Sequence, residues 1–255
     1  MSDSPDFLYE KRGHIAIMTW NRPEKKNCFT PQMMDDFYEA FGDFDNDDDL
    51  WVAILAAAGE DSWCAGGDLD TMIPAITSGE FKINEDPTKR VFHDIFKPII
   101  CAVNGFASLE LVQGTDLCVA SENASFVLGE TRWGMIPAGG SHVRLPRYIP
   151  WFIAMEALLL GRPIPARRAY EIGLVNRLVP TVAEVLPTAL ELAEKLCQNG
   201  PLAVRTAKEI AVRSWNHEPA YVLENALFQR VRESEDAKEG PRAYMEHRKP
   251  VFKGR

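Results

Sequence analysis

Two glutamates stand where apolar strand patterns give way to small residues. Glu110 lies in the first turn of an expected helix, shortly after an apolar run that ends at Val103. Glu130 lies in a glycine-punctuated loop beyond the strand pattern of residues 124–127. Carboxyls with apolar neighbours can have pKa values suited to acid and base roles in a cleft. Taken singly, either glutamate also fits a helix-terminus or ion-pair role, so both interpretations stay open.

A third segment, residues 63–69, brings backbone groups rather than acids. Its apolar start predicts a buried strand, which turns through Ala65, Gly66 and Gly67 into an expected helix. Glycines in such a turn leave backbone N–H groups outside the regular hydrogen bonding of a strand or helix. The segment therefore predicts free amide donors near the two glutamates.

Signatures of several other chemistries are missing from the sequence. It contains no GxxxxGK[ST], no GxGxxG after a strand, no HExxH and no GxSxG. This argues against nucleotide hydrolysis, dinucleotide hydride transfer and serine-based acyl transfer. The five histidines lack metal-ligand spacing and the five cysteines form no CxxC pair, so we expect no metal and mostly buried thiols. Carboxylates and backbone groups must carry any mechanism.

The elements expected around these segments alternate between strands and helices. Apolar runs predict strands at residues 13–20, 51–58, 99–103, 116–120, 124–127 and 174–179. Thr30 and Pro31 are typical of a helix start, and an apolar stripe follows at Met33, Phe37, Phe41 and Phe44. Strands that alternate with helices predict a layered α/β domain.

The last quarter of the chain is expected to be helical. Helix patterns cover residues 182–197, 203–214, 220–232 and 241–247, separated by Gly200-Pro201, Pro219 and Gly240-Pro241. We therefore expect an α/β core over residues 1–199 and a C-terminal helical region over residues 200–255. Short apolar stripes on these helices are typical of packing faces, on the core or on a neighbouring subunit.

Charge and hydropathy narrow the classes of partner. The chain has 28 basic and 37 acidic residues, a net charge of −9 and an isoelectric point near 5.2, which disfavours nucleic acid as a partner. Its longest uncharged apolar stretch, residues 51–58, is far shorter than the roughly 18 residues that a membrane span needs. The first residues lack a signal-peptide pattern. We expect no membrane association and a cytoplasmic location.

A series of short motifs runs in order along nearly the whole chain. They are Asn21-Arg22-Pro23 with Asn27, Ala65-Gly66-Gly67-Asp68-Leu69, Lys97-Pro98 before Ala102-Val103-Asn104-Gly105, Glu130 with Gly134 and Pro137, Gly139-Gly140-Ser141, and Leu159-Leu160-Gly161-Arg162. Any one of them is weak evidence. In this order and spacing they resemble the crotonase family, also called the enoyl-CoA hydratase/isomerase superfamily.

The resemblance implies a crotonase-like spiral of repeated strand-strand-helix units with a C-terminal helical trimerisation region. It implies homotrimers, often paired as hexamers, and an acyl-CoA substrate, with no cofactor because coenzyme A is part of the substrate. The family's shared chemistry is stabilisation of a thioester enolate by two backbone N–H groups. In its hydratases, two glutamates flank the reacting carbons, one activating water and one supplying a proton, and Glu110 and Glu130 match them.

The same resemblance assigns binding roles to individual residues. By position, the amide of Gly67 is one enolate donor, within a substrate-binding turn that includes Ala65, Asp68 and Leu69. Because coenzyme A is anionic and the chain is acidic, binding requires local basic groups. The resemblance places the coenzyme A contacts, some from an adjacent subunit, at Lys25, Lys26, Phe252 and Lys253.

Two departures from the family pattern affect the expected site. The turn at residues 106–109 is shorter than usual and contains no glycine. Counting back from Glu110 assigns the second donor to Ala107, whereas counting forward from Gly105 does not. In addition, Gly129 replaces the proline that usually precedes the second acid.

Hydration of an enoyl-CoA is therefore the leading functional hypothesis. Double-bond isomerisation or thioester hydrolysis on the same fold is the first alternative. A catalytically silent acyl-CoA-binding protein is the second, because the turn that supplies the second donor is shortened. Acyl chain length and the choice between trimer and hexamer stay open.

Overall fold

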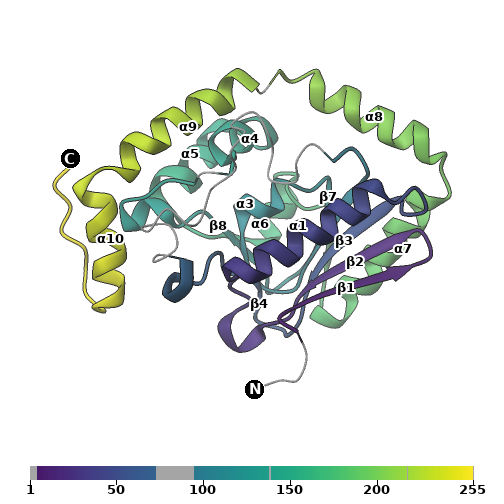
Figure 1. Ribbon diagram of the computed structural model, residues 1–255, viewed down its shortest axis with the longest axis horizontal. Helices are drawn as coiled ribbons and strands as arrows, with labels where there is room; N and C mark the ends of the chain where they lie inside the picture. The colour runs from purple at the N-terminus through teal and green to yellow at the C-terminus, as the bar shows by residue number, and fades with distance from the viewer. Residues whose placement is uncertain (1–4, 73–94, 138, 217, 255) are drawn as a thin grey trace.

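Two β sheets enclose the main core of the protein (Figure 1). The structure is a computed structural model and describes residues 5–72, 95–137, 139–216 and 218–254. The larger sheet has the strand order β1 (Phe7–Arg12), β2 (Ile15–Trp20), β3 (Val52–Ala57), β5 (Ile99–Val103), β7 (Leu117–Ser121) and β10 (Arg177–Val179). The smaller sheet has the order β4 (Ser62–Cys64), β6 (Phe106–Ser108), β8 (Ser125–Val127) and β9 (Ile164–Pro165).

Successive strands alternate between the two sheets. The pairs β3 and β4, β5 and β6, and β7 and β8 each place the first strand in the larger sheet and the second in the smaller one. Neighbours from β2 to β10 are parallel in the larger sheet, as are β4, β6 and β8 in the smaller sheet. This winding confirms the expected α/β class and its repeated strand pairs.

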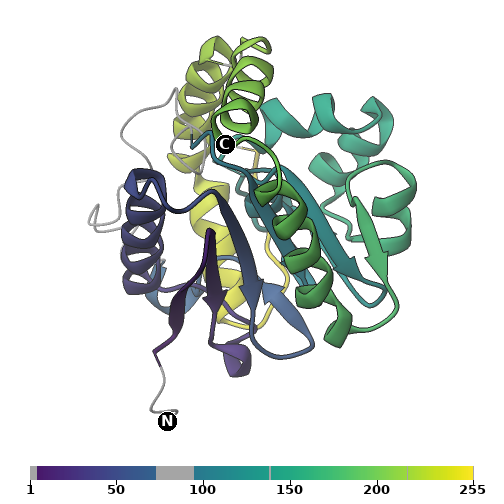
Figure 2. The same cartoon turned by 90° about the vertical axis from the view of Figure 1, so that its right-hand side faces the viewer.

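Helices cover both faces of the larger sheet. Side chains of β2 alternate, with Met18 in the core shared with α1 (Pro31–Asn46) and Ile17 in a second core. The second core is closed by α7 (Val185–Cys197), which lies on the opposite face of the sheet from α1 (Figure 2). Thr30 caps α1 by accepting from the Met33 N–H at 3.2 Å, and the predicted stripe on α1 is buried.

Shorter helices connect these layers, and three longer ones form the C-terminal part. The C-terminal helices α8 and α9 run along one side of the molecule, and α10 turns back beside the core (Figure 1). No helix in the described ranges is both long and apolar enough to cross a bilayer. The bounds are η1 (Pro23–Lys25), α3 (Leu109–Val112), η2 (Glu130–Trp133), α4 (Ser141–Tyr148), α5 (Trp151–Leu160), α6 (Ala166–Glu171), η3 (Val182–Glu184), α8 (Pro201–Arg213), α9 (Glu218–Arg232) and α10 (Glu235–Met245).

Most expected elements are present, but the prediction for the last helix was wrong. It was expected at residues 241–247, whereas α10 spans Glu235–Met245. It begins at Glu235, where the Ser234 hydroxyl accepts from the Ala237 N–H at 3.0 Å, so Gly240 and Pro241 lie inside it. A Cβ on Gly240 would lie 1.7 Å from the Trp133 carbonyl oxygen, so close packing explains the glycine. Strand β1 was not expected. The division of the chain at residue 199 stays a prediction.

Candidate active site

The three chemistry-bearing segments meet at one edge of the smaller sheet. Cys64 of β4 pairs with Ala107 of β6, and Ala107 pairs with Phe126 of β8, all in parallel orientation. The glycine turn follows β4, Glu110 follows β6, and Glu130 follows β8. Carboxyl ends of parallel strands are the usual place for a binding crevice. The sheet therefore gathers the predicted groups into one candidate site.

The turn after β4 holds the backbone of Gly67 in a defined orientation. The Phe29 N–H donates to the Gly66 carbonyl at 3.0 Å, and the Asp68 N–H donates to the Phe29 carbonyl at 2.8 Å. In this parallel bridge the residues on either side of Gly67 make the bonds, so the N–H of Gly67 points the opposite way. No hydrogen bond occupies that N–H within the described part of the chain. The amide is available as a donor.

Asp68 fixes this turn with both carboxylate oxygens. One oxygen accepts from the Asp70 N–H at 3.1 Å and caps the helix that starts at Leu69. The other accepts from the Arg22 guanidinium at 2.6 Å. Ala65 is tied to the neighbouring loop by its N–H, which donates to the Lys26 carbonyl at 3.2 Å. These contacts position the turn and leave the chemistry to its backbone.

The residues expected to contact coenzyme A lie in two places. Lys25 and Lys26 are exposed beside the Gly67 turn. Phe252 lies near the turn after Glu130, because a Cβ on Gly134 would come within 3.0 Å of its ring. Lys253 pairs with Glu235 at 2.8 Å on the same chain. Their coenzyme A contacts stay predictions.

The side chain of Glu110 is buried and accepts two hydrogen bonds. Its Oε1 accepts from the Gly139 N–H at 2.7 Å and from the Ser141 hydroxyl at 3.1 Å. The pKa of Glu110 is raised above its usual value, mainly by burial and further by the charge of Glu224, although the Gly139 hydrogen bond and the charge of Arg144 act to lower it. Two donors aimed at one oxygen suit a carboxyl that carries negative charge.

Glu130 is also buried, but it differs from Glu110 in its hydrogen bonding. Its Oε2 is buried without a hydrogen-bond partner, and burial followed by the charge of Glu110 raises its pKa to about 7. A carboxyl in such surroundings retains its proton near neutral pH. Neighbouring carboxyls whose surroundings separate their pKa values are suited to a base and an acid. The pKa values of both carboxyls are raised, and the two hydrogen bonds to Glu110 favour the carboxylate form there more than at Glu130.

Ala107 does not lie at the mouth of a helix. It is completely buried within β6. The Ser125 N–H donates to the Gly105 carbonyl at 3.3 Å, and the parallel register then directs the Ala107 amide toward β8. The assignment of Ala107 as second donor stays a prediction that this register does not support.

Sequence reasoning missed a group of side chains behind Glu110. Glu224 of α9 is buried and accepts from the His142 N–H at 3.1 Å, with His142 Nδ1 at 3.0 Å from the same oxygen. Arg144 of α4 is also fully buried. The sequence held only a weak signal for this group. Tyr221 and Glu224 are three residues apart, a spacing that places both on one side of α9, and both are buried.

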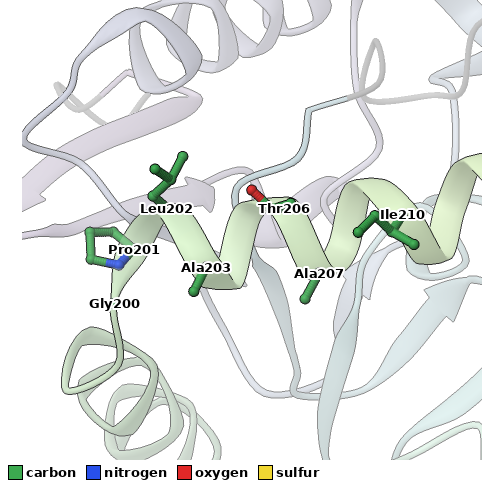
Figure 3. Close-up of a pocket in the computed structure, with 7 residues that line it drawn as sticks. All are labelled: Gly200, Pro201, Leu202, Ala203, Thr206, Ala207 and Ile210. Atoms are coloured by element: carbon green, nitrogen blue, oxygen red, sulfur yellow. The ribbon is translucent and has the colours of Figure 1, made fainter.

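A separate apolar groove runs along α8 (Figure 3). It is lined by Gly200, Pro201, Leu202, Ala203, Thr206, Ala207 and Ile210. These residues carry no acid or base, so the groove offers contact area rather than chemistry.

The fold and the paired carboxyls define an enzyme of the crotonase fold. The family model described as enoyl-CoA hydratase/isomerase matches residues 10–255. Enoyl-CoA hydratase EchA19 of Mycobacterium tuberculosis is 39% identical to the chain, covering 100% of it and 99% of the relative. The chain belongs to the enoyl-CoA hydratase/isomerase family.

Two further relatives extend the similarity. Carnitinyl-CoA dehydratase of Proteus mirabilis is 36% identical over 96% of the chain and 97% of the relative. The solved structure of EchA1_1 from Mycobacterium paratuberculosis matches with a TM-score of 0.88 at 36% identity, covering 99% of the chain and 100% of that structure. The likeness therefore covers the C-terminal helices as well as the core.

The raised pKa of Glu130 predicts a pH-dependent cost in stability. The folded state binds this proton more tightly than the unfolded chain, so the stability contributed by Glu130 is lost as pH rises from about 4.5 to about 7. Glu130→Gln should raise the free energy of unfolding at pH 8 relative to wild type, by up to about 3 kcal/mol, and much less at pH 5. Urea unfolding at both pH values measures this. The exposed Glu122→Gln is the control, and an equal effect of Glu130→Gln at both pH values would contradict the prediction.

Proposed function

We propose that the protein adds water reversibly across the 2,3 double bond of an enoyl-CoA thioester. The observation that carries this proposal is the pair of neighbouring carboxyls with opposite environments, one hydrogen-bonded as an anion and one buried with an unpartnered oxygen. Hydration needs one group to accept a proton from water and another to deliver a proton to carbon. Glu110 and Glu130 suit these two roles.

In the proposed reaction, the carboxylate of Glu110 removes a proton from water as the water oxygen attacks carbon 3. The double-bond electrons move toward the thioester, whose oxygen becomes negative in the enolate. The amide of Gly67 donates to that oxygen, at a site fixed before charge develops. Glu130 then protonates carbon 2, which gives a 3-hydroxyacyl-CoA. The reverse sequence removes water.

Isomerisation, thioester hydrolysis and silent acyl-CoA binding are the alternatives. Hydration is favoured by the relatives that align with the chain over nearly their whole length. They are named enoyl-CoA hydratase and carnitinyl-CoA dehydratase, and both names denote addition or removal of water. The acyl group is not fixed by this argument. Both 2-butenoyl-CoA and carnitinyl-CoA are therefore rational first substrates, and a cytoplasmic location suits either.

Assays with these two thioesters test the proposed function. We expect 2-butenoyl-CoA to gain one water by mass spectrometry, or carnitinyl-CoA to lose one. Glu110→Gln and Glu130→Gln should each lower kcat by about 100-fold or more, because each removes a proton-transfer group. Glu122→Gln, an exposed carboxyl paired with Arg167, should leave kcat unchanged. Full activity in either site variant would rule out that residue's role, and an unchanged mass with both thioesters would count against hydration.

The amide of Gly67 can be tested with a matched pair of variants. Gly67→Pro removes the N–H, so kcat should fall by about 100-fold or more if that donor stabilises the enolate. Gly67→Ala keeps the N–H and brings a Cβ only to 3.0 Å from the flexible Met72 side chain, so its kcat should stay within about tenfold of wild type. Thermal unfolding verifies that both variants fold. Equal losses in the two variants would exclude the donor role.

We further propose that the chain assembles as a homotrimer or a dimer of trimers. Large apolar side chains are strongly exposed on three helices: Phe152 of α5 is 86% exposed, Leu202 of α8 is 69% exposed, and Leu223 of α9 is 59% exposed. Exposed apolar surface of this kind marks an interaction site, and a second copy of the chain is the proposed occupant.

Native mass measurement tests this assembly. Wild type should contain three or six copies of the 28.6 kDa chain. Leu202→Glu with Ile210→Glu places charge in the α8 groove and should shift the protein toward monomer, because a buried unpaired charge is costly. A monomeric wild type would exclude the assembly.

A further inference from the structure

Arg144 of α4 is a fully buried cation with an incomplete set of hydrogen bonds. Its Nη2 donates to the Gly139 carbonyl, whereas Nε and Nη1 have no partner among the described residues. Arginine stays protonated in proteins, so this charge cannot be removed by deprotonation. A buried charge is costly unless an opposite charge lies close to it. The position of Arg144 therefore requires a nearby anion.

The peptide of Gly139 connects Arg144 to Glu110. Its carbonyl accepts from Arg144, and its N–H donates to Glu110 Oε1 at 2.7 Å. The next residue, Gly140, has φ +93°, and a Cβ there would lie 3.2 Å from Arg144 Nη2 and 2.8 Å from the Tyr221 ring. The loop is thus packed between the guanidinium and α9. Arg144 therefore acts on Glu110 through the Gly139 peptide: it binds the carbonyl oxygen of that peptide, and the N–H of Gly139 orients Glu110.

The other charged groups around the pair do not replace Arg144. The charges of Glu130 on η2 and Glu224 on α9 disfavour a charge on their neighbour Glu110. His142 is bonded to Glu224, and the charges of His142 and Arg132 act to lower the pKa of Glu130. Arg144 is the cation whose charge acts on Glu110. Its positive charge favours the ionised form of Glu110, whereas burial and the neighbouring carboxylates disfavour that form.

We propose that Arg144 is a positioning residue that keeps Glu110 charged and correctly oriented, so that the proton of the glutamate pair stays on Glu130. The inference rests on the proposed hydration, in which Glu110 is the base. Without the cation, the two buried carboxyls compete for one proton on more equal terms. The base would then be protonated at neutral pH, although the acyl-CoA pocket would be unchanged.

The pH profile of Arg144→Gln is the main test. At pH 7 we expect kcat to fall by about tenfold or more, because Glu110 becomes harder to ionise, and the acidic limb of the pH–rate profile should move to higher pH by about one pH unit or more. KM for the thioester should stay within about threefold of wild type. Arg144→Lys keeps the charge and should restore part of the activity. Arg147→Gln, which removes an exposed arginine from the same helix, should leave the profile unchanged.

A merely structural role predicts a different pattern. It would lower kcat and raise KM at every pH, with no movement of the acidic limb, and that result would overturn the proposal. If Arg144→Gln does not fold, Arg144→Met, which also removes the charge, replaces it in this test. Ser141→Ala removes one hydrogen bond to Glu110 without touching Arg144, so it should move the limb the same way by less. An unmoved limb in Arg144→Met would also exclude the role.

Infrared titration separates this inference from the proposed function. The ionised and protonated carboxyl bands of Glu110, identified by their loss in Glu110→Gln, can be followed with pH in wild type and in Arg144→Gln or Arg144→Met. We expect protonation of Glu110 at higher pH when the arginine is replaced. An unchanged titration overturns the proposal even if the enzyme hydrates thioesters. A shifted titration in a protein without hydratase activity would leave the electrostatic role intact and reject only the reaction.

Discussion

Three short parallel strands, β4, β6 and β8, end at the same edge of the smaller sheet, and the site depends on this register. Cys64, Ala107 and Phe126 lie side by side, so the segments that follow them are brought together although they are distant in sequence. A slip of one residue in β6 would reverse the direction of every side chain on it. Glu110, which follows that strand at once, would then lose its place beside the loop of α4.

Hydrogen bonding gives two chemically identical side chains different environments. Glu110 receives two hydrogen bonds and the influence of a buried arginine, whereas Glu130 keeps one oxygen buried and unpartnered. An unsatisfied buried oxygen costs stability, and such sites persist where the surrounding fold is strong enough to hold them. Here the extensive core between the sheets supplies that support. At a position with no functional role, the same unpartnered carboxyl oxygen would only lower the stability of the fold.

Local patterns in the sequence account for much of the fold and for only part of the site. The strand β5 and the apolar stripe of α1 follow from continuous or periodic apolar residues, because these signals lie within one element. Both glutamates were found through motifs that are also local. The contact of His142 with Glu224 joins residues 82 positions apart, so no local pattern predicts it. The start of α10 was missed because its glycine serves a contact with Trp133 rather than a helix end.

The shortened turn before Glu110 affects the two proposed parts of catalysis differently. Strand β6 continues to Ser108 and α3 begins at Leu109, so no glycine turn separates them. Glu110 keeps its orientation nevertheless, since its partners Gly139 and Ser141 belong to a different segment, the loop before α4 and the start of that helix. Proton transfer therefore does not need the missing glycines. Stabilisation of the enolate does depend on amide donors, and in this chain Gly67 is the predicted donor whose N–H the backbone geometry leaves available. If the proposed reaction holds, its barrier should be more sensitive to the Gly67 turn than in an enzyme with two glycine-rich turns.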